Sequence, residues 1–252
     1  MADDSIELKS IKPVTELADF VESIWMIKNH SDVHKDIVVI PDGRFDIIFF
    51  SSLTGSFHST LRGLDTKPDQ AQIPANAIMF AVSFKLLAIE YLLELKMASV
   101  LNTGKQLSDD FWGITKDDLL DFEAFCIKIS QVMISQIKPG IDSRKKKLFD
   151  LIYNAKGSMP VSQLSEQVFW SSRQIGRYFN EQFGISLKAF SNILRFRASL
   201  QQIKQGKFFP EQNFSDQTHF IKEIKKFSGV VPKELSKNEN DRFILLSALP
   251  KE

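Results

Sequence analysis

Residues 161–184, VSQLSEQVFWSSRQIGRYFNEQFG, are the stretch that decides the fold of the second half of this chain. Their pattern predicts two short helices joined by a tight turn, because apolar residues recur three and four positions apart on both sides of Trp170. Ser171 is placed to cap the second helix, since a serine hydroxyl accepts a hydrogen bond from a free backbone N–H. Gly184 is placed to end that helix in a left-handed conformation.

The outer face of the second predicted helix is polar and cationic. Arg173, Gln174 and Arg177 lie opposite an inner stripe that contains Ile175 and Phe179. An amphipathic helix with arginine and glutamine outward has the chemistry of a helix that reads the major groove of DNA. Amphipathic helix pairs with basic surfaces also occur in many other helical proteins, so this segment by itself leaves a generic helical pair equally open.

The composition describes a chain of 252 residues with room for two hydrophobic cores. Its single cysteine, Cys126, lies among apolar residues and is expected to be a buried small hydrophobe. One cysteine supports neither a disulfide framework nor a cysteine-based zinc site within one chain, so a reducing cytosol is the expected compartment. No apolar run is long enough to span a bilayer, and the acidic start is unlike a signal peptide, so no membrane partner is expected.

The nearly neutral net charge of +1 hides a split between the two halves. Residues 1–141 carry 13 Lys and Arg against 20 Asp and Glu, whereas residues 142–252 carry 19 against 11. The sign changes near Lys138-Pro139-Gly140, which has the composition of a linker. An acidic half joined to a basic half suggests that only the second half meets a polyanion.

The first half reads as a mixed α and β domain with a mostly antiparallel sheet. The pattern predicts strands over 22–27, 37–40, 45–50, 59–64 and 77–84, and helices over 14–21, 86–95 and 116–137. Its expected apolar interior is lined by Trp25, Phe45, Ile47, Phe49 and Phe84. A filled core is the default for such an interior.

Catalytic or metal-binding patterns are not found in the sequence, so we expect neither an enzyme nor a cofactor. His30 and His34 are four residues apart in an expected loop, without a third ligand beside them. Asp42, Arg44 and Asp46 are close together, and we interpret them as an ion pair or turn contact rather than a catalytic carboxylate pair.

The remainder of the second half is predicted to be helical, over 142–154, 187–204 and 216–227, followed by a last turn from Pro232. Two of its passages share one plan. Each passage begins with a polar capping residue and continues with apolar residues four positions apart and an aromatic residue. Each then reaches a glycine, after which a new helix starts. The two passages are SSRQIGRYFNEQFGISLKAF (171–190) and SDQTHFIKEIKKFSGVVPKEL (215–235).

This repeat, with the long helix containing LRFRASL (194–200) between its halves, closely resembles the DNA-binding domain of the AraC family of bacterial transcription regulators. The resemblance covers about residues 142–235. The first half more weakly resembles a domain often found ahead of it, in FVESIWMI (20–27), VIPDGRFDIIF (39–49) and VSF (82–84). That domain is thought to sense a ligand or to dimerise.

The resemblance implies two helix-turn-helix units held by a linker helix and entering adjacent major grooves. By position, the family's base-reading side chains fall on Arg173, Gly176, Arg177, Gln217, Thr218, Ile221 and Lys222. Further contacts to phosphate are expected from Ser171, Ser172, Lys188 and Lys225.

Two departures from the family pattern affect this expectation. Gly176 has no side chain where the family reads a base, so that readout is lost or shifts to Gln174. The stretch between Gly206 and Asp216 is too short for the usual first helix of the second unit. We expect an aromatic prop of Phe208, Phe209 and Phe214 to replace that helix, and weaker DNA binding by the second unit.

The sequence therefore predicts an α+β chain with an N-terminal regulatory or dimerisation domain over 1–138, an AraC-type all-α DNA-binding domain over 142–236 and a tail over 237–252. Its expected function is sequence-specific transcription regulation in a bacterial cytoplasm. The expected partner is double-stranded DNA, with a small-molecule effector in the first domain and a homodimer as further possibilities. The alternative from another class is a helical protein-interaction module without specific DNA binding.

Overall fold

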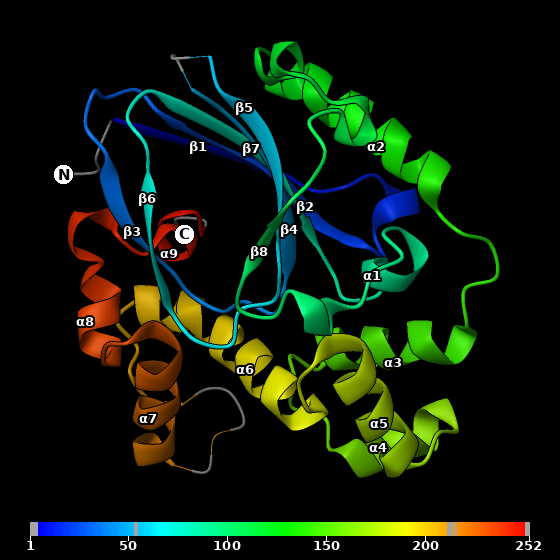
Figure 1. Ribbon diagram of the computed structural model, residues 1–252. Coiled ribbons are helices and arrows are strands. Elements are labelled where there is room, and N and C mark those ends of the chain that lie inside the picture. The colour runs from blue at the N-terminus through cyan, green and yellow to red at the C-terminus, as the bar shows by residue number, and fades with distance from the viewer. Residues whose placement is uncertain (1–4, 53–54, 211–213, 215, 250–252) are drawn as a thin grey trace.

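The computed structural model describes residues 5–52, 55–210, 214 and 216–249 of the chain. The first half forms an antiparallel sheet crossed by one long helix, and the second half is helical (Figure 1). This arrangement confirms the fold class expected from the alternating and helical periodicities.

The strands are β1 (Ile6–Ile11), β2 (Val21–Asn29), β3 (Lys35–Val39), β4 (Phe45–Ser52), β5 (Phe57–Arg62), β6 (Asp69–Ile73), β7 (Ala77–Phe84) and β8 (Gly104–Gln106). The α-helices are α1 (Ala88–Tyr91), α2 (Phe122–Gln136), α3 (Ser143–Asn154), α4 (Val161–Val168), α5 (Ser172–Phe183), α6 (Leu187–Lys204), α7 (Gln217–Ser228), α8 (Pro232–Lys237) and α9 (Ile244–Ser247). Short 3₁₀ turns are η1 (Thr15–Leu17), η2 (Met97–Ser99), η3 (Phe111–Gly113), η4 (Lys116–Leu119) and η5 (Glu239–Asp241).

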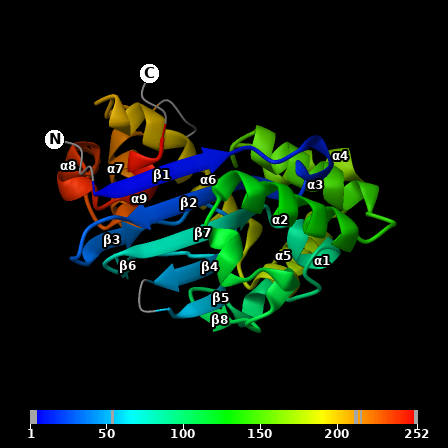
Figure 2. The same cartoon turned by 90° about the horizontal axis from the view of Figure 1, so that it is seen from above.

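Six strands form the main sheet in the order β1-β2-β7-β4-β5-β8, and β3 pairs with β6 in a separate two-stranded sheet (Figure 2). Strand β4 shows how alternation builds the first core. Its residues Phe45, Ile47 and Phe49 are buried on one face, whereas the residues between them are half-buried. The Phe49 ring meets Phe125 of α2 edge-on, with 5.6 Å between ring centroids, so α2 closes this face of the sheet.

The opposite face of the main sheet packs toward β3 and β6 around a second, smaller cluster of Ile27, Ile37 and Ile73. Trp25 lies on this face, where its indole N–H donates to Asp46 over 3.2 Å. The expectation that Trp25 shares the interior of Phe45 is wrong, because successive residues of a strand point to opposite faces.

Three helices of the first half differ from the sequence prediction. The helix expected over 14–21 is reduced to the 3₁₀ turn η1, and its last residue, Val21, begins strand β2. The helix expected over 86–95 is reduced to the single turn α1, after which Glu94 adopts a left-handed conformation. The helix expected over 116–137 is divided into η4 and α2. Asp121 causes the division, because it is extended and its carboxylate caps α2 by accepting from the N–H groups of Glu123 and Ala124.

Strands β1, β6 and β8 were not expected from the pattern. They run along sheet margins. Strands β6 (DQAQI) and β8 (GKQ) lack a clear alternation of apolar and polar residues, and β1 (IELKSI) alternates only over its first four residues. A strand recruited at an edge by backbone pairing carries a weak side-chain signal. Local sequence therefore identified the central strands and missed the peripheral ones.

The first helix-turn-helix unit has the predicted form. Ser171 caps α5, and its hydroxyl accepts from the backbone N–H of Gln174 over 3.2 Å. Gly184 ends α5 with φ of 72°, a value that glycine adopts without steric cost. Ser186 caps α6 in the same way, with Ala189 N–H as donor over 3.1 Å.

The second unit is abbreviated, as the sequence suggested. None of the described residues between α6 and α7 is helical. Phe214 supports α7, with its ring 5.1 Å from that of Phe220. Phe209 is 70% exposed, so the expectation that it also props the helix is wrong. Residues 211–213, within the expected prop segment, lie outside the described residues.

The segment expected as a tail is folded as far as residue 249. Phe243 and Leu246 are buried in the main core, and Val38 of β3 donates its backbone N–H to the Arg242 carbonyl over 2.7 Å. The Lys204 ammonium at the end of α6 donates to the carbonyls of Leu246 and Leu249. This segment therefore joins the linker helix to the first half of the chain. No helix among the described residues is long and apolar enough to cross a membrane.

Candidate DNA-binding surface

The outer face of α5 carries the side chains that the sequence singled out. Ser171, Ser172, Arg173, Gln174 and Arg177 are all exposed on or beside its first two turns. The inner face is fixed by Ile175, Phe179 and Phe183, which are fully buried. With residues three and four apart on one face, this burial turns the arginines outward.

Gln174 is not free to read a base in the way the sequence suggested. Its side-chain oxygen accepts from the Ser171 backbone N–H over 2.8 Å, and it lies 2.9 Å from the Ser171 hydroxyl. These contacts complete a capping box at the start of α5. A bidentate contact to adenine needs both the oxygen and the nitrogen of the amide. In the capped state only the nitrogen remains for that purpose.

Arg177 is held only weakly. Its Nε lies 4.0 Å from Glu181 one turn later, and both side chains are about 70% exposed. Ion pairs of this kind contribute little stability, so the guanidinium can exchange this partner for a DNA base or phosphate. At Gly176 an added Cβ would meet nothing within 4 Å among the described residues, so this part of the α5 face is open.

A shallow groove runs beside this face, between α5 and the start of α3. It is lined by Arg144, Trp170, Gln174, Arg177, Tyr178 and Glu181. The Arg144 guanidinium lies over the Trp170 ring at 5.2 Å and pairs with Asp142. Arg144 was not predicted from the sequence, because its approach to α5 depends on the packing of α3 against the helix pair.

The other flank of α5 is bound to the first half of the chain. The Tyr178 hydroxyl donates to Glu90 of α1, and the Lys145 ammonium of α3 pairs with the same carboxylate. Burial, followed by the negative charge of Glu90, raises the pKa of Tyr178, so its hydroxyl stays protonated and donates. Gln182 adds a hydrogen bond of 2.9 Å to the Leu95 carbonyl. The first half therefore helps to orient α5.

The linker helix α6 is bound to the first half by a second charged contact. Glu22 of β2 accepts from buried Arg44 over 3.0 Å and from Arg197 of α6 over 3.1 Å. Burial disfavours the charged carboxylate, but the two arginines outweigh it and lower the pKa of Glu22 to about 2. The ring of Tyr153 lies 4.3 Å from the Arg44 guanidinium, so α3 joins the same contact.

Helix α7 presents the second set of expected contacts. Gln217, Thr218, Lys222 and Lys225 are exposed along it, and Ile221 is half-buried. Asp216 caps the helix by accepting from the His219 backbone N–H over 2.8 Å. Phe220, Ile224 and Phe227 are buried beneath, and the Phe227 ring lies 5.3 Å from Phe196 of α6. The linker helix is thus the main support of α7.

Helices α5 and α7, which carry the two sets of expected DNA contacts, lie at opposite ends of α6 (Figure 1). Lys188, exposed on the first turn of α6, lies next in the chain after the α5 face. The structure therefore groups the predicted contact residues at two helices: Ser171, Ser172, Arg173, Gln174 and Arg177 at α5, and Gln217, Thr218, Lys222 and Lys225 on α7.

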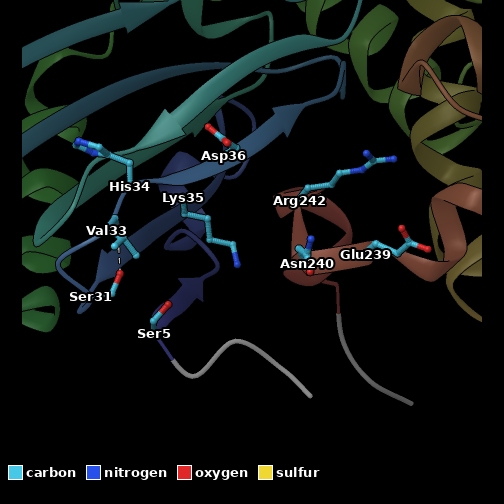
Figure 3. A pocket seen from close by; sticks show the side chains of 9 residues that line it. All are labelled: Ser5, Ser31, Val33, His34, Lys35, Asp36, Glu239, Asn240 and Arg242. Atoms are coloured by element: carbon cyan, nitrogen blue, oxygen red, sulfur yellow. Dashed lines mark hydrogen bonds between the residues drawn. The ribbon is translucent and has the colours of Figure 1, made fainter.

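A surface depression between β3 and the C-terminal segment is a weaker candidate for a ligand site. Figure 3 shows that its side chains diverge: His34 and Asp36 point away from Arg242 and Glu239 across the depression. Arg242 instead pairs with Glu234 over 2.9 Å, and His34 accepts from the Ala75 backbone N–H. Among the described residues that line the depression, His34, Asp36, Glu239 and Arg242 do not converge on a point that a ligand atom would occupy.

Other titratable groups also have structural partners. The backbone N–H of Arg44 donates to Asp42 over 2.9 Å, which confirms the turn contact expected from the sequence. Burial and the nearby charge of Asp42 raise the pKa of Asp46 to about 7. Burial raises the pKa of the Cys126 thiol to about 12, so it is a protonated, buried side chain as expected. Among the described residues, no group of three or more His, Cys, Asp and Glu could hold a metal ion.

Comparison with known families gives one match, in the first half. Residues 9–105 match a family described as a domain of unknown function (DUF6597). No curated protein matches the sequence.

Among solved structures, the chain is similar to ToxT from Vibrio cholerae. A 1.65 Å structure of ToxT is 12% identical, with a TM-score of 0.41 over 92% of this chain and 97% of that one. ToxT from Vibrio cholerae O395 is 12% identical, with a TM-score of 0.43 over 98% and 100% of the two chains. The same protein bound to (E)-4-(8-methylnaphthalen-1-yl)but-3-enoic acid is 12% identical, with a TM-score of 0.43 over 96% and 98%.

Proposed function

We propose that this AraC-type chain is a sequence-specific DNA-binding transcription regulator that reads the major groove with α5 and, more weakly, with α7. The observation that carries the proposal is the pair of outward polar faces at the two ends of one linker helix. Arg173 and Arg177 supply bidentate donors for guanine on the first face. Gln217, Thr218 and Lys222 supply the second face.

The division of charge supports the same function. The second half, residues 142–252, has an excess of eight positive charges, whereas residues 1–141 have an excess of seven negative charges. Phosphate contacts would come from Lys188, Lys225, Ser171 and Ser172. Gln174 would contribute its amide nitrogen, since its oxygen caps α5.

We assign a regulatory role to residues 1–138 in this proposal. Glu90 contacts α5 and Glu22 contacts α6, so a change in the first half would alter the placement of both the reading helix and the linker. A small-molecule effector acting in this half would have to change one of these contacts to affect DNA binding.

A second copy of the chain is the partner we propose for the outer side of α2. Ile127 and Ile134 are exposed there seven residues apart, which places them along one line of the helix, and Leu120 is exposed just before the helix begins. In an antiparallel pair, Ile127 of one copy would meet Ile134 of the other. Sedimentation of Ile127→Glu should shift from dimer to monomer, and an unchanged dimer would reject this interface.

Selection of binding sites from random duplexes by the full chain tests the main proposal. We expect an enriched motif, and an affinity for it that falls steeply with salt because phosphate contacts release counterions. A helical module that binds only proteins would enrich no motif and would show no such salt dependence on duplex DNA. Either of those results would reject the proposal.

A further inference from the structure

The turn between α4 and α5 contains a strained and exposed aromatic residue. Phe169 ends α4 in the left-handed conformation, with φ of 55° and ψ of 35°. Its side chain is 85% exposed, and among the described residues it belongs to neither apolar core. Both features are unfavourable for phenylalanine, since its Cβ crowds the backbone in this conformation and its ring gains nothing from burial.

Other helices of the second half end in the same backbone conformation, but on residues that tolerate it. Helices α5, α7 and α8 end on Gly184, Gly229 and Asn238 in the same left-handed region, and glycine and asparagine tolerate it. Only α4, among these four, ends there on a bulky residue. Strain of this kind persists where the side chain has a use, so the outlier points to a function for the Phe169 ring.

The surroundings of Phe169 indicate what it meets. It lies two residues before Ser171, the cap of α5, and four before Arg173. The N-terminal residues of a recognition helix contact base edges, so the turn ahead of them lies at the margin of the groove. The exposed arginines nearby favour a polyanionic partner, and the 5-methyl group of thymine is the apolar group that duplex DNA offers in the major groove.

We propose that Phe169 contacts the 5-methyl group of a thymine at the edge of the site read by α5, and so determines part of the sequence specificity. This inference rests on the proposed function, because it assumes that α5 enters the major groove. It adds a specificity residue that acts by apolar contact, beside the charged contacts of Arg173 and Arg177. Neighbouring Trp170 is not available for this role, since its ring packs on Tyr178 and Arg144.

The test compares Phe169→Gly and Phe169→Asn with Phe169→Leu in the full chain, on a duplex selected by the wild type. The first two substitutions remove the ring and suit the left-handed backbone, so we expect a melting temperature unchanged or raised by up to about 3 °C. Their affinity for the selected duplex should fall about five- to tenfold, with the same dependence on salt, because no phosphate contact is lost. Phe169→Leu should retain more of the affinity. Val33→Ala, an exposed apolar residue in the first half, is the control and should change nothing.

Replacing single thymines of the duplex by uracil identifies the contact. At one position, loss of the 5-methyl group should weaken wild-type binding about as much as Phe169→Gly does, and should not weaken binding by that variant further. If the two losses add, the ring contacts another part of the duplex and the thymine assignment is wrong.

The same measurements separate failure of this inference from failure of the proposed function. Normal affinity of Phe169→Gly, together with loss of affinity in Arg173→Ala, would overturn the inference and leave the proposed function intact. If the wild type selects no duplex at all, both are rejected.

Discussion

Helices α5 and α7, the two helices proposed to read DNA, are held in place in different ways. Helix α5 packs on α4, and Phe149 of α3 packs against its Phe179 and Phe183. Its flank is bound to Glu90 of the first half. Helix α7 rests on α6 and α8, and the described residues between α6 and α7 contain no helix. Equivalent sequence repeats therefore have unequal support. A repeat in sequence preserves the inner apolar stripe, whereas the surroundings of each copy decide how firmly its outer face is oriented.

The contact of Glu22 with the linker helix α6 supports both helix-turn-helix units. Its loss should therefore give the largest effect, measured as a loss of stability. Glu22→Gln removes the charge that compensates buried Arg44 and half-buried Arg197, so we expect the free energy of unfolding to fall by about 2–4 kcal/mol. Urea unfolding at pH 7 measures this. Glu7→Gln is the matched control. Glu7 pairs with Lys9 and His30 near the surface, so its substitution should cost less than about 1 kcal/mol.

The free energy of unfolding should also depend on pH through the Glu22 carboxylate. The pKa of Glu22 in the folded chain is about 2, below its ordinary value of 4.5. Its contribution is therefore fully present above about pH 4.5 and is lost as the pH falls toward 2. Glu22→Gln should flatten the stability profile over that range, and an unchanged profile would mean that the two arginines do not depend on this carboxylate.

Loss of the arginines on α5 should give the next largest effect. Arg173→Ala and Arg177→Ala should each weaken specific DNA binding by about 1–3 kcal/mol with unchanged stability, because both side chains are exposed. Titration of the selected duplex, with thermal unfolding as the control, measures both quantities. If both variants bind like the wild type, α5 is not the reading helix, and the proposed difference between α5 and α7 in DNA binding is wrong.

Release of the contact between α5 and the first half should give a smaller effect, confined to the first unit. Glu90→Gln weakens the contacts to Tyr178 and Lys145, and we expect a loss of about 1 kcal/mol in stability. Footprinting should show altered protection at the half of the site bound by α5. A change of equal size at the half bound by α7 would contradict the separate support of the two helices.

Substitutions on α7 should give the smallest effects. Gln217→Ala and Lys222→Ala should each cost no more than about 1 kcal/mol in DNA binding, because the described residues ahead of α7, from 205 on, form no helix that would fix the docking angle. Isothermal titration on the same duplex compares them directly with the α5 variants. Losses equal to those of Arg173→Ala would show that Phe214 and the linker helix orient α7 as well as α4 orients α5.

Local sequence determined the helical half of this chain closely. Ser171, Gly184, Ser186 and Asp216 lie where the pattern placed the helix ends, because caps and left-handed turns depend on residues close in the chain. The central strands were likewise predictable from alternation. The division into domains and the DNA contacts of the named side chains stay predictions.

The tertiary structure alone decided what lies between the two halves. Glu22 and Arg197 are 175 positions apart, and Glu90 and Tyr178 are 88 apart, so no periodicity reports their pairing. The same holds for the C-terminal segment, whose Phe243 enters a core built by residues far ahead of it. Periodicity tells which face of an element is buried, because burial repeats with the backbone; which partner buries it depends on the packing of the whole chain.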